Sequence, residues 1–177
     1  HMKLSIRAAI LSIFVLAITM SGSSIVKANE ETNFPKGRTV VISIDPSSIS
    51  DNRNASLLES FTGILSTLQP GENFYFSTMD DPGHFWGPFE AGSMNFTSYK
   101  SLLEEKISGY IPDNTLNMPE VVSQVYNLMG TESAPAGSTL YLVGSKEVPT
   151  DLEYTARRLD PLVDMFASRG WLITGIP

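Results

Sequence analysis

The sequence contains no cysteine and only two histidines, one of which is the first residue. The missing cysteine excludes disulfide bonds, thiol catalysis and Cys-ligated zinc, so a hydrophobic core alone must hold an exported fold together. Glycine is absent from the turn Asp45–Ser50 that comes after the most apolar strand, which excludes a dinucleotide-binding turn. No G-x-S-x-G turn accompanies His84, so a Ser-His-Asp hydrolase lacks its usual sequence signal.

Residues 1–28 have the pattern of a secretory signal peptide. Lys3 and Arg7 precede the apolar run from Ala8 to Met20, and Val26-Lys27-Ala28 has the small-x-small form of a cleavage site. The apolar run is too short for a comfortable membrane span. We therefore predict cleavage after Ala28 and an extracytoplasmic location, secreted or periplasmic, with His1-Met2 as tag residues ahead of the native start.

Basic residues are scarce in the chain beyond the signal peptide. Cleavage removes three of the 12 basic residues and none of the 19 acidic ones, which leaves a formal charge of about −10. Such a surface repels nucleic acid and anionic lipid, so we expect neither as a partner. Residues 29–37 are polar, with Pro35 and Gly37, and predict a linker before a single domain over residues 38–177.

The apolar periodicity of residues 38–177 predicts an α/β domain. Buried strands are expected at 39–45, 73–79, 138–144 and 171–176, and helices at 54–68, 97–107, 120–129 and 151–169. The aromatic but Gly- and Pro-broken segment 85–89 predicts a short antiparallel edge strand or a hairpin arm. This order predicts a mostly parallel, doubly wound, Rossmann-like sheet with helices on both faces.

The strand at 39–45 ends in a carboxylate and then a group of hydroxyls: Asp45, then Ser47, Ser48 and Ser50. Ligands of open α/β sheets bind at this end of the strands. Oxygen ligands of this kind suit a hard divalent cation. The same residues are also common in a capped turn, where their side chains accept hydrogen bonds from backbone amides. Both interpretations place the functional face here.

The element order, the short hairpin and the segments Thr39–Ser50 and Pro112–Glu120 resemble the von Willebrand factor type A (VWA) family over about residues 38–177. In that family the first strand ends in D-x-S-x-S. These oxygens, a threonine from a later loop and an aspartate after the fourth strand hold a divalent cation at the metal-ion-dependent adhesion site. A carboxylate of the partner commonly completes the coordination. The resemblance implies a VWA-like domain that binds a protein and is not an enzyme, with Mg²⁺, Ca²⁺ or Mn²⁺ as its ion.

The match to that motif is partial. The resemblance implies four metal ligands: Asp45, Ser47, Ser50 and Thr115. However, Ile49 takes the place of the second motif serine, and Gly144 comes after the fourth strand where the family has its aspartate. We therefore expect a degraded site with weak or absent cation binding. The expected partner-binding residues are Asp45, Ser47, Asp113 and Thr115.

Several alternatives remain open. Asp80, Asp81 and Asp113 are either further cation ligands or ordinary turn residues. The family usually continues beyond Ile176, so the domain is expected to be truncated or minimal, with an open edge strand that favours self-association. Two other functions compete with the adhesion-type hypothesis. One is a secreted hydrolase whose polar residues meet only in three dimensions, and the other is a metal-free structural or assembly domain.

Overall fold

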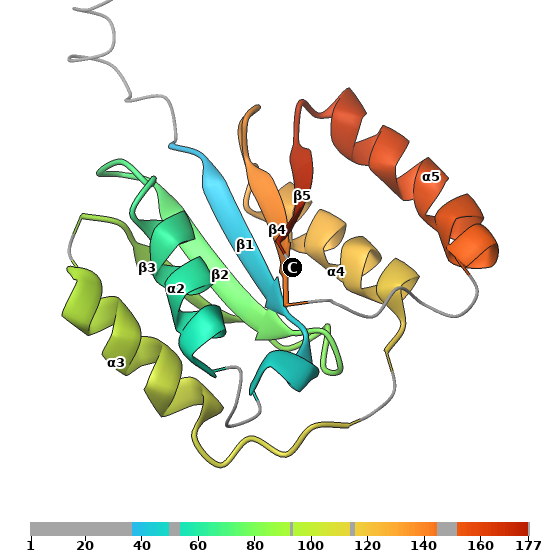
Figure 1. Cartoon of the computed structure of the whole chain (residues 1–177). Helices are drawn as coiled ribbons and strands as arrows, with labels where there is room; N and C mark the ends of the chain where they lie inside the picture. The colour runs from blue at the N-terminus through green and yellow to red at the C-terminus, as the bar shows by residue number, and fades with distance from the viewer. Residues whose placement is uncertain (1–36, 50–53, 93, 114–115, 145–151, 177) are drawn as a thin grey trace, which may run out of the picture. The chain divides into compact units, whose positions relative to one another are not determined.

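A computed structural model describes residues 37–49, 54–92, 94–113, 116–144 and 152–176 of the chain (Figure 1). The predicted signal peptide, residues 29–36 of the linker, Ser50 and Thr115 lie outside the described residues. Within the described part of the chain, no helix has both the length and the apolar character needed to cross a membrane.

Five strands form one sheet in the order β3-β2-β1-β4-β5. Their bounds are Thr39–Ile44 (β1), Asn73–Thr78 (β2), Trp86–Glu90 (β3), Thr139–Val143 (β4) and Leu172–Ile176 (β5). β1 pairs in parallel with β2 and β4, and β5 pairs in parallel with β4. β3 pairs antiparallel with β2. The predicted mostly parallel sheet with one antiparallel edge strand is therefore confirmed, and β1 is its central strand.

Helices cover both faces of the sheet (Figure 1). Their bounds are Asn54–Leu65 (α2), Phe96–Ile107 (α3), Met118–Thr131 (α4) and Leu152–Ser168 (α5), and a single 3₁₀ turn, η1, spans Pro46–Ile49 after β1. α2 and α3 pack on one face, and α4 and α5 on the other. Asn95 and Asn117 cap α3 and α4, because each side-chain oxygen accepts the N–H of the residue three positions later.

Two hydrophobic cores hold β1 between them. Val40, Ile42 and Ile44 pack toward α2 and α3, where Phe61 meets Phe76 edge-on at a centroid distance of 5.1 Å. The alternate residue Val41 packs toward α4 and α5. All six residues of β1 are buried, as expected for a strand covered on both faces. This packing fixes the carboxyl end of β1 in the middle of one sheet edge.

One buried polar atom of β1 has no partner. Ser43 is 0% exposed, and its Oγ is the single buried side-chain polar atom without a hydrogen bond among the described residues. Ser43→Ala is therefore expected to raise the free energy of unfolding by about 1 kcal/mol, because it removes an unsatisfied hydroxyl. Urea denaturation measures the change. Ser138→Ala is the matched control. It should destabilise, since Ser138 Oγ accepts the Thr39 N–H at 2.9 Å. A lower stability of Ser43→Ala would contradict the prediction.

Candidate functional site

The ends of β2, β1 and β4 lie side by side at the carboxyl edge of the sheet. The Asp45 N–H donates to the Val143 carbonyl at 2.9 Å, and the Met79 N–H donates to the Ile44 carbonyl at 2.9 Å. Asp45 therefore stands between the residues just after β2 and those just after β4. This central part of the edge is where the sequence predicts the functional face.

The Asp45 side chain closes its own turn. Asp45 is 4% exposed, and its Oδ1 accepts the Ser47 N–H at 2.9 Å. Its carbonyl accepts both the N–H of Ser48, at 2.9 Å, and the hydroxyl of Ser48, at 2.6 Å. Ser48 is buried, whereas Ser47 is exposed. These bonds are those of a capped turn, one of the two interpretations that the sequence left open.

Gly144 occupies the position at which the VWA resemblance calls for an aspartate. Its φ is +84°, and a Cβ on it would lie 2.6 Å from Ser48 Cβ and 2.8 Å from Ser48 Oγ. Its N–H donates to the Ile176 carbonyl at 2.7 Å. The space beside the end of β4 is thus filled by η1, and the backbone conformation favours glycine.

Of the four ligands predicted for a hard divalent cation, only Asp45 and Ser47 lie in the described part of the chain. Such an ion needs about six oxygen ligands in near-octahedral geometry. Asp45 already accepts a backbone N–H, and Ser48 has turned its hydroxyl to the Asp45 carbonyl. Among the described residues, no group of three or more His, Asp or Glu side chains is placed to hold a metal. Cation binding by Asp45, Ser47, Ser50 and Thr115 stays a prediction.

A second carboxylate organises the same edge. Asp80 comes after β2, and its Oδ1 accepts the hydroxyl of Tyr110 in a short hydrogen bond. Its Oδ2 accepts the N–H of Asp113 at 2.7 Å. The Tyr110 hydroxyl also lies 2.7 Å from Thr78 Oγ1, which completes a chain of three side chains. Burial and the hydrogen bond to Asp80 raise the pKa of Tyr110 to about 12.

The hydrogen bonds of Asp80 join the end of β2 to the later loop, and the partner-binding role of Asp113 stays a prediction. Asp113 was predicted to bind the partner, and its side chain is exposed while its backbone amide is tied to Asp80. Asp80 was predicted as either a ligand or a turn residue, and both its oxygens accept hydrogen bonds from the later loop. Tyr110 was not singled out from the sequence, because the segment between the predicted helices carries no periodic signal there.

The loop held by Asp80 carries an exposed apolar residue. Ile111 is 86% exposed, the highest value among the exposed large hydrophobic residues that the structure describes. Pro112 beside it is also exposed, and Leu116 further along is 46% exposed. Tyr110 and Asp113, which flank Ile111 and Pro112, are the two residues bonded to Asp80. An apolar tip is thus fixed at the edge where ligands of such sheets bind.

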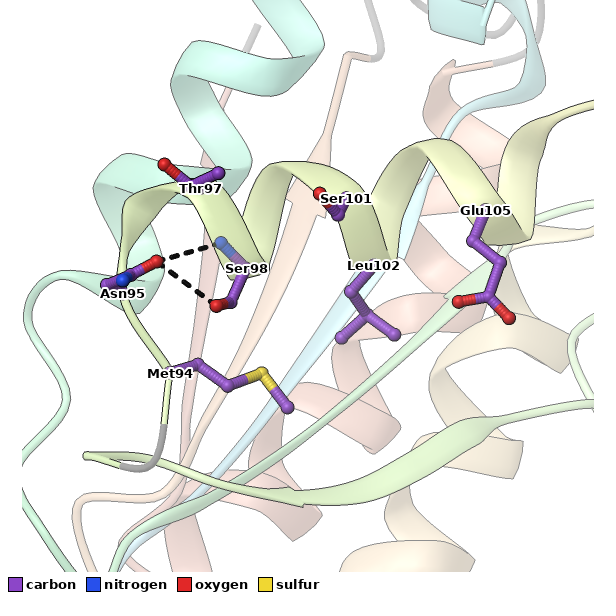
Figure 2. A pocket seen from close by; sticks show the side chains of 7 residues that line it. All are labelled: Met94, Asn95, Thr97, Ser98, Ser101, Leu102 and Glu105. Atoms are coloured by element: carbon purple, nitrogen blue, oxygen red, sulfur yellow. Dashed lines mark hydrogen bonds between the residues drawn. The ribbon is translucent and has the colours of Figure 1, made fainter.

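Two concave regions lie near α3. A cavity of about 390 Å³ separates the start of α2 from the end of α3, and Tyr110 and Glu104 are among its lining residues. A more open hollow of about 670 Å³ runs along α3 (Figure 2). In Figure 2 Met94 and Leu102 give it an apolar floor, and Asn95 Oδ1 is bonded to the N–H and hydroxyl of Ser98.

The described residues that line these two regions include no histidine. His84 lies in the segment before the edge strand β3, where its ring meets Trp86 edge-on at 5.9 Å. The Tyr110 hydroxyl in the smaller cavity is already bonded to Asp80 and Thr78. The hydrolase alternative stays a prediction.

Comparison with known proteins finds similarity to solved structures but no match to a family model or a curated protein. Among solved structures, a von Willebrand factor type A from Catenulispora acidiphila is similar to it, with a TM-score of 0.44 and 14% identity. The alignment covers 80% of this chain and 39% of that one, so the chain spans well under half of that protein's length. The sheet order and pairing themselves establish the class, a mostly parallel α/β domain with one antiparallel edge strand.

Proposed function

We propose that this domain binds a protein partner at the carboxyl edge of its sheet and catalyses no reaction. The observation that carries the proposal is Ile111, which is 86% exposed on a loop fixed by hydrogen bonds to Asp80 on either side of it. The exposed side chain of Ile111, on a loop bonded on both sides of it, suits an interface anchor that fills a pocket on the partner. The exposed residues Ser47 and Asp113 lie at the same edge and would form a polar rim.

The proposed binding does not depend on a divalent cation. Asp45 is nearly buried and serves its own turn, so it supports the surface rather than touching the partner. We therefore propose that the partner offers an apolar pocket for Ile111. An acidic partner side chain is the expectation only if a cation is held after all.

The extracytoplasmic location of this binding is part of the proposal and depends on the predicted signal peptide. Self-association through β5, one of the two edge strands of the described sheet, also stays a prediction.

Photo-crosslinking tests the site and its metal dependence together. A benzoylphenylalanine placed at position 111 is expected to capture one partner from the extracytoplasmic fraction of the source organism, with the same yield in EDTA. The matched control is the same group at position 163, because Val163 is also an exposed apolar residue but lies on α5. Excess wild-type protein should compete, whereas Ile111→Ser should compete at least about tenfold less well.

Three results would contradict the proposal. The first is a failure to capture any protein from position 111, and the second is equal capture from both positions, since neither identifies this edge as the binding surface. The third is capture that is lost in EDTA and restored by Mg²⁺. That result would favour a cation-dependent site over the metal-independent one.

A further inference from the structure

We propose that Asp80 and Tyr110 are positioning residues, which together with Thr78 hold the loop of residues 109–113 in its binding conformation in place of a bridging cation. We call these three residues the edge clamp. The inference rests on the proposed function, because the loop it positions is the one that presents Ile111.

The sheet supplies a rigid base for the edge clamp. Thr78 is the last residue of β2 and is buried. The next residue, Met79, donates its N–H to the Ile44 carbonyl at the end of β1. Asp80 therefore projects from a segment that is bonded to the central strand. A carboxylate fixed in this way has little freedom to move with the loop, so the loop must adapt to it.

The loop is attached to this base at two points on either side of Ile111. Tyr110 precedes Ile111 and donates its hydroxyl to Asp80 Oδ1, while the Asp113 N–H donates to Oδ2 at 2.7 Å. Hydrogen bonds to a carboxylate are shorter and stronger than those between neutral groups. The Tyr110 N–H also donates to the Ile107 carbonyl at 3.0 Å, which ties the loop to the end of α3. Ile111 and Pro112 thus form a short bridge between fixed ends.

The chemistry of Tyr110 keeps the edge clamp closed over a wide pH range. Its hydroxyl can donate to Asp80 only while it is protonated. Burial and the hydrogen bond to Asp80 raise its pKa to about 12, so it remains a neutral donor at physiological pH. A loop ordered before binding loses less conformational freedom when the partner arrives, which favours affinity.

On the other side of the edge, the described side chains of the turn after β1 bond within that turn. A bridging ion would have to join the turn after β1 to the later loop. That turn is instead closed on itself by Asp45 and Ser48, and Gly144 leaves no room for a further carboxylate beside it. Asp80, one strand away, makes the connection to the loop directly.

Hydrogen exchange of the free protein tests the edge clamp without any partner. In Asp80→Asn the Asp113 amide should exchange at least about tenfold faster than in the wild type, since one of two acceptor oxygens is lost. Tyr110→Phe should speed exchange across residues 109–113 several-fold. The matched controls are Asp81→Asn, which makes the same change at the exposed neighbouring residue, and Tyr141→Phe, which removes a hydroxyl from β4 and leaves the edge clamp intact. Both should exchange as the wild type does, and EDTA should change nothing.

The outcomes distinguish the edge clamp from the proposed binding of a partner at this edge. Wild-type exchange in both Asp80→Asn and Tyr110→Phe would overturn the edge clamp, whatever position 111 captures. Faster exchange with a cross-linking yield lowered at least about fivefold would support it. Faster exchange with an unchanged yield would overturn the positioning role and leave the proposed function intact. Faster exchange in a protein that captures nothing from position 111 would contradict the proposed function and leave the edge clamp standing. Slower exchange on adding Mg²⁺ would overturn the claim that the loop needs no cation.

Discussion

Gly144→Asp is expected to lower the free energy of unfolding by about 3 kcal/mol or more and to add no binding of Mg²⁺ or Mn²⁺. The substitution restores the aspartate that the VWA resemblance calls for, so it is a direct test of whether this site is merely missing one ligand. Two costs add up. The φ of +84° is strained for any residue with a Cβ, and the new Cβ would overlap Ser48 at 2.6 Å. Urea denaturation and calorimetric titration measure the two parts of the prediction.

A second glycine separates these two costs. Gly71 has nearly the same φ, +86°, but a Cβ on it would meet nothing within 4 Å. Gly71→Asp should therefore show the backbone cost alone, about 1–2 kcal/mol. The difference between the two variants measures the collision with η1. Adding Ser48→Gly to Gly144→Asp should recover part of that difference, because it removes the side chain that the new Cβ meets.

Equal destabilisation by Gly144→Asp and Gly71→Asp would show that η1 yields easily and that the space beside β4 is available. Heat on adding Mg²⁺ to Gly144→Asp, abolished by a further Asp45→Ala, would show that the site is one ligand short of a working cation site. Either result would contradict the idea that the hydrogen bonds of Asp45 and Ser48 close the turn after β1 and leave no room for a further metal-binding carboxylate.

The fold was predictable because its strongest signals are local. The run Val40–Ile44 is apolar on both alternating faces, which is typical of a central parallel strand, and β1 is central. Gly87 and Pro88 made segment 85–89 a poor interior strand, and β3 is an edge strand with an irregular register. The aromatic residues of that segment pair with β2, as Phe89 faces Phe74 and Trp86 faces Phe76.

The position of Asp45 at the carboxyl edge of the sheet was predictable, but the hydrogen bonds around it were not. Motif spacing singles out Ser47, whose role as a ligand stays a prediction, and the hydroxyl that closes the turn is that of Ser48. The reason is that η1 is a 3₁₀ turn, which brings the residue three positions after Asp45 over the Asp45 carbonyl. At Gly144 the sequence shows only an absent carboxylate. The positive φ and the contact with Ser48 depend on how η1 packs against β4.

The edge clamp could not have been predicted from the spacing of residues in the sequence. Asp80 and Tyr110 are 30 residues apart, and β3 and α3 lie between them in the chain. Neither residue has a periodic signal, because one comes after a strand in a turn and the other lies in a loop. Their meeting depends on the packing of α3 beside β2, which directs the end of α3 toward the carboxyl edge. Contacts of this kind require the tertiary structure.

Alkaline solution is expected to destabilise the domain between about pH 10 and pH 12 through two tyrosines. Burial raises the pKa of both Tyr75 and Tyr110 from 10.0 to about 12, with hydrogen bonds to Glu132 and Asp80 as the next causes. In the unfolded chain both would titrate near their ordinary pKa. The stabilising contribution is therefore complete below pH 10 and is lost as the pH rises through about 12, because the unfolded state releases its protons first. The loss should be on the order of 1–2 kcal/mol for each tyrosine, since solvent screening reduces the effect, above all at the partly exposed Tyr110.

Urea midpoints measured from about pH 9 to about pH 12 test this prediction, and variants divide it between the two sites. Tyr110→Phe and Tyr75→Phe should each lower stability at pH 9 and flatten its decline above pH 10, because each removes one group that titrates differently in the two states. Tyr141→Phe, which leaves both of these hydroxyls in place, should decline as steeply as the wild type. The result also bears on the edge, since ionised Tyr110 can no longer donate to Asp80 and the loop carrying Ile111 should then exchange faster. A wild-type urea midpoint that stays constant across this pH range would contradict the prediction. It would mean that folding raises the pKa of neither tyrosine.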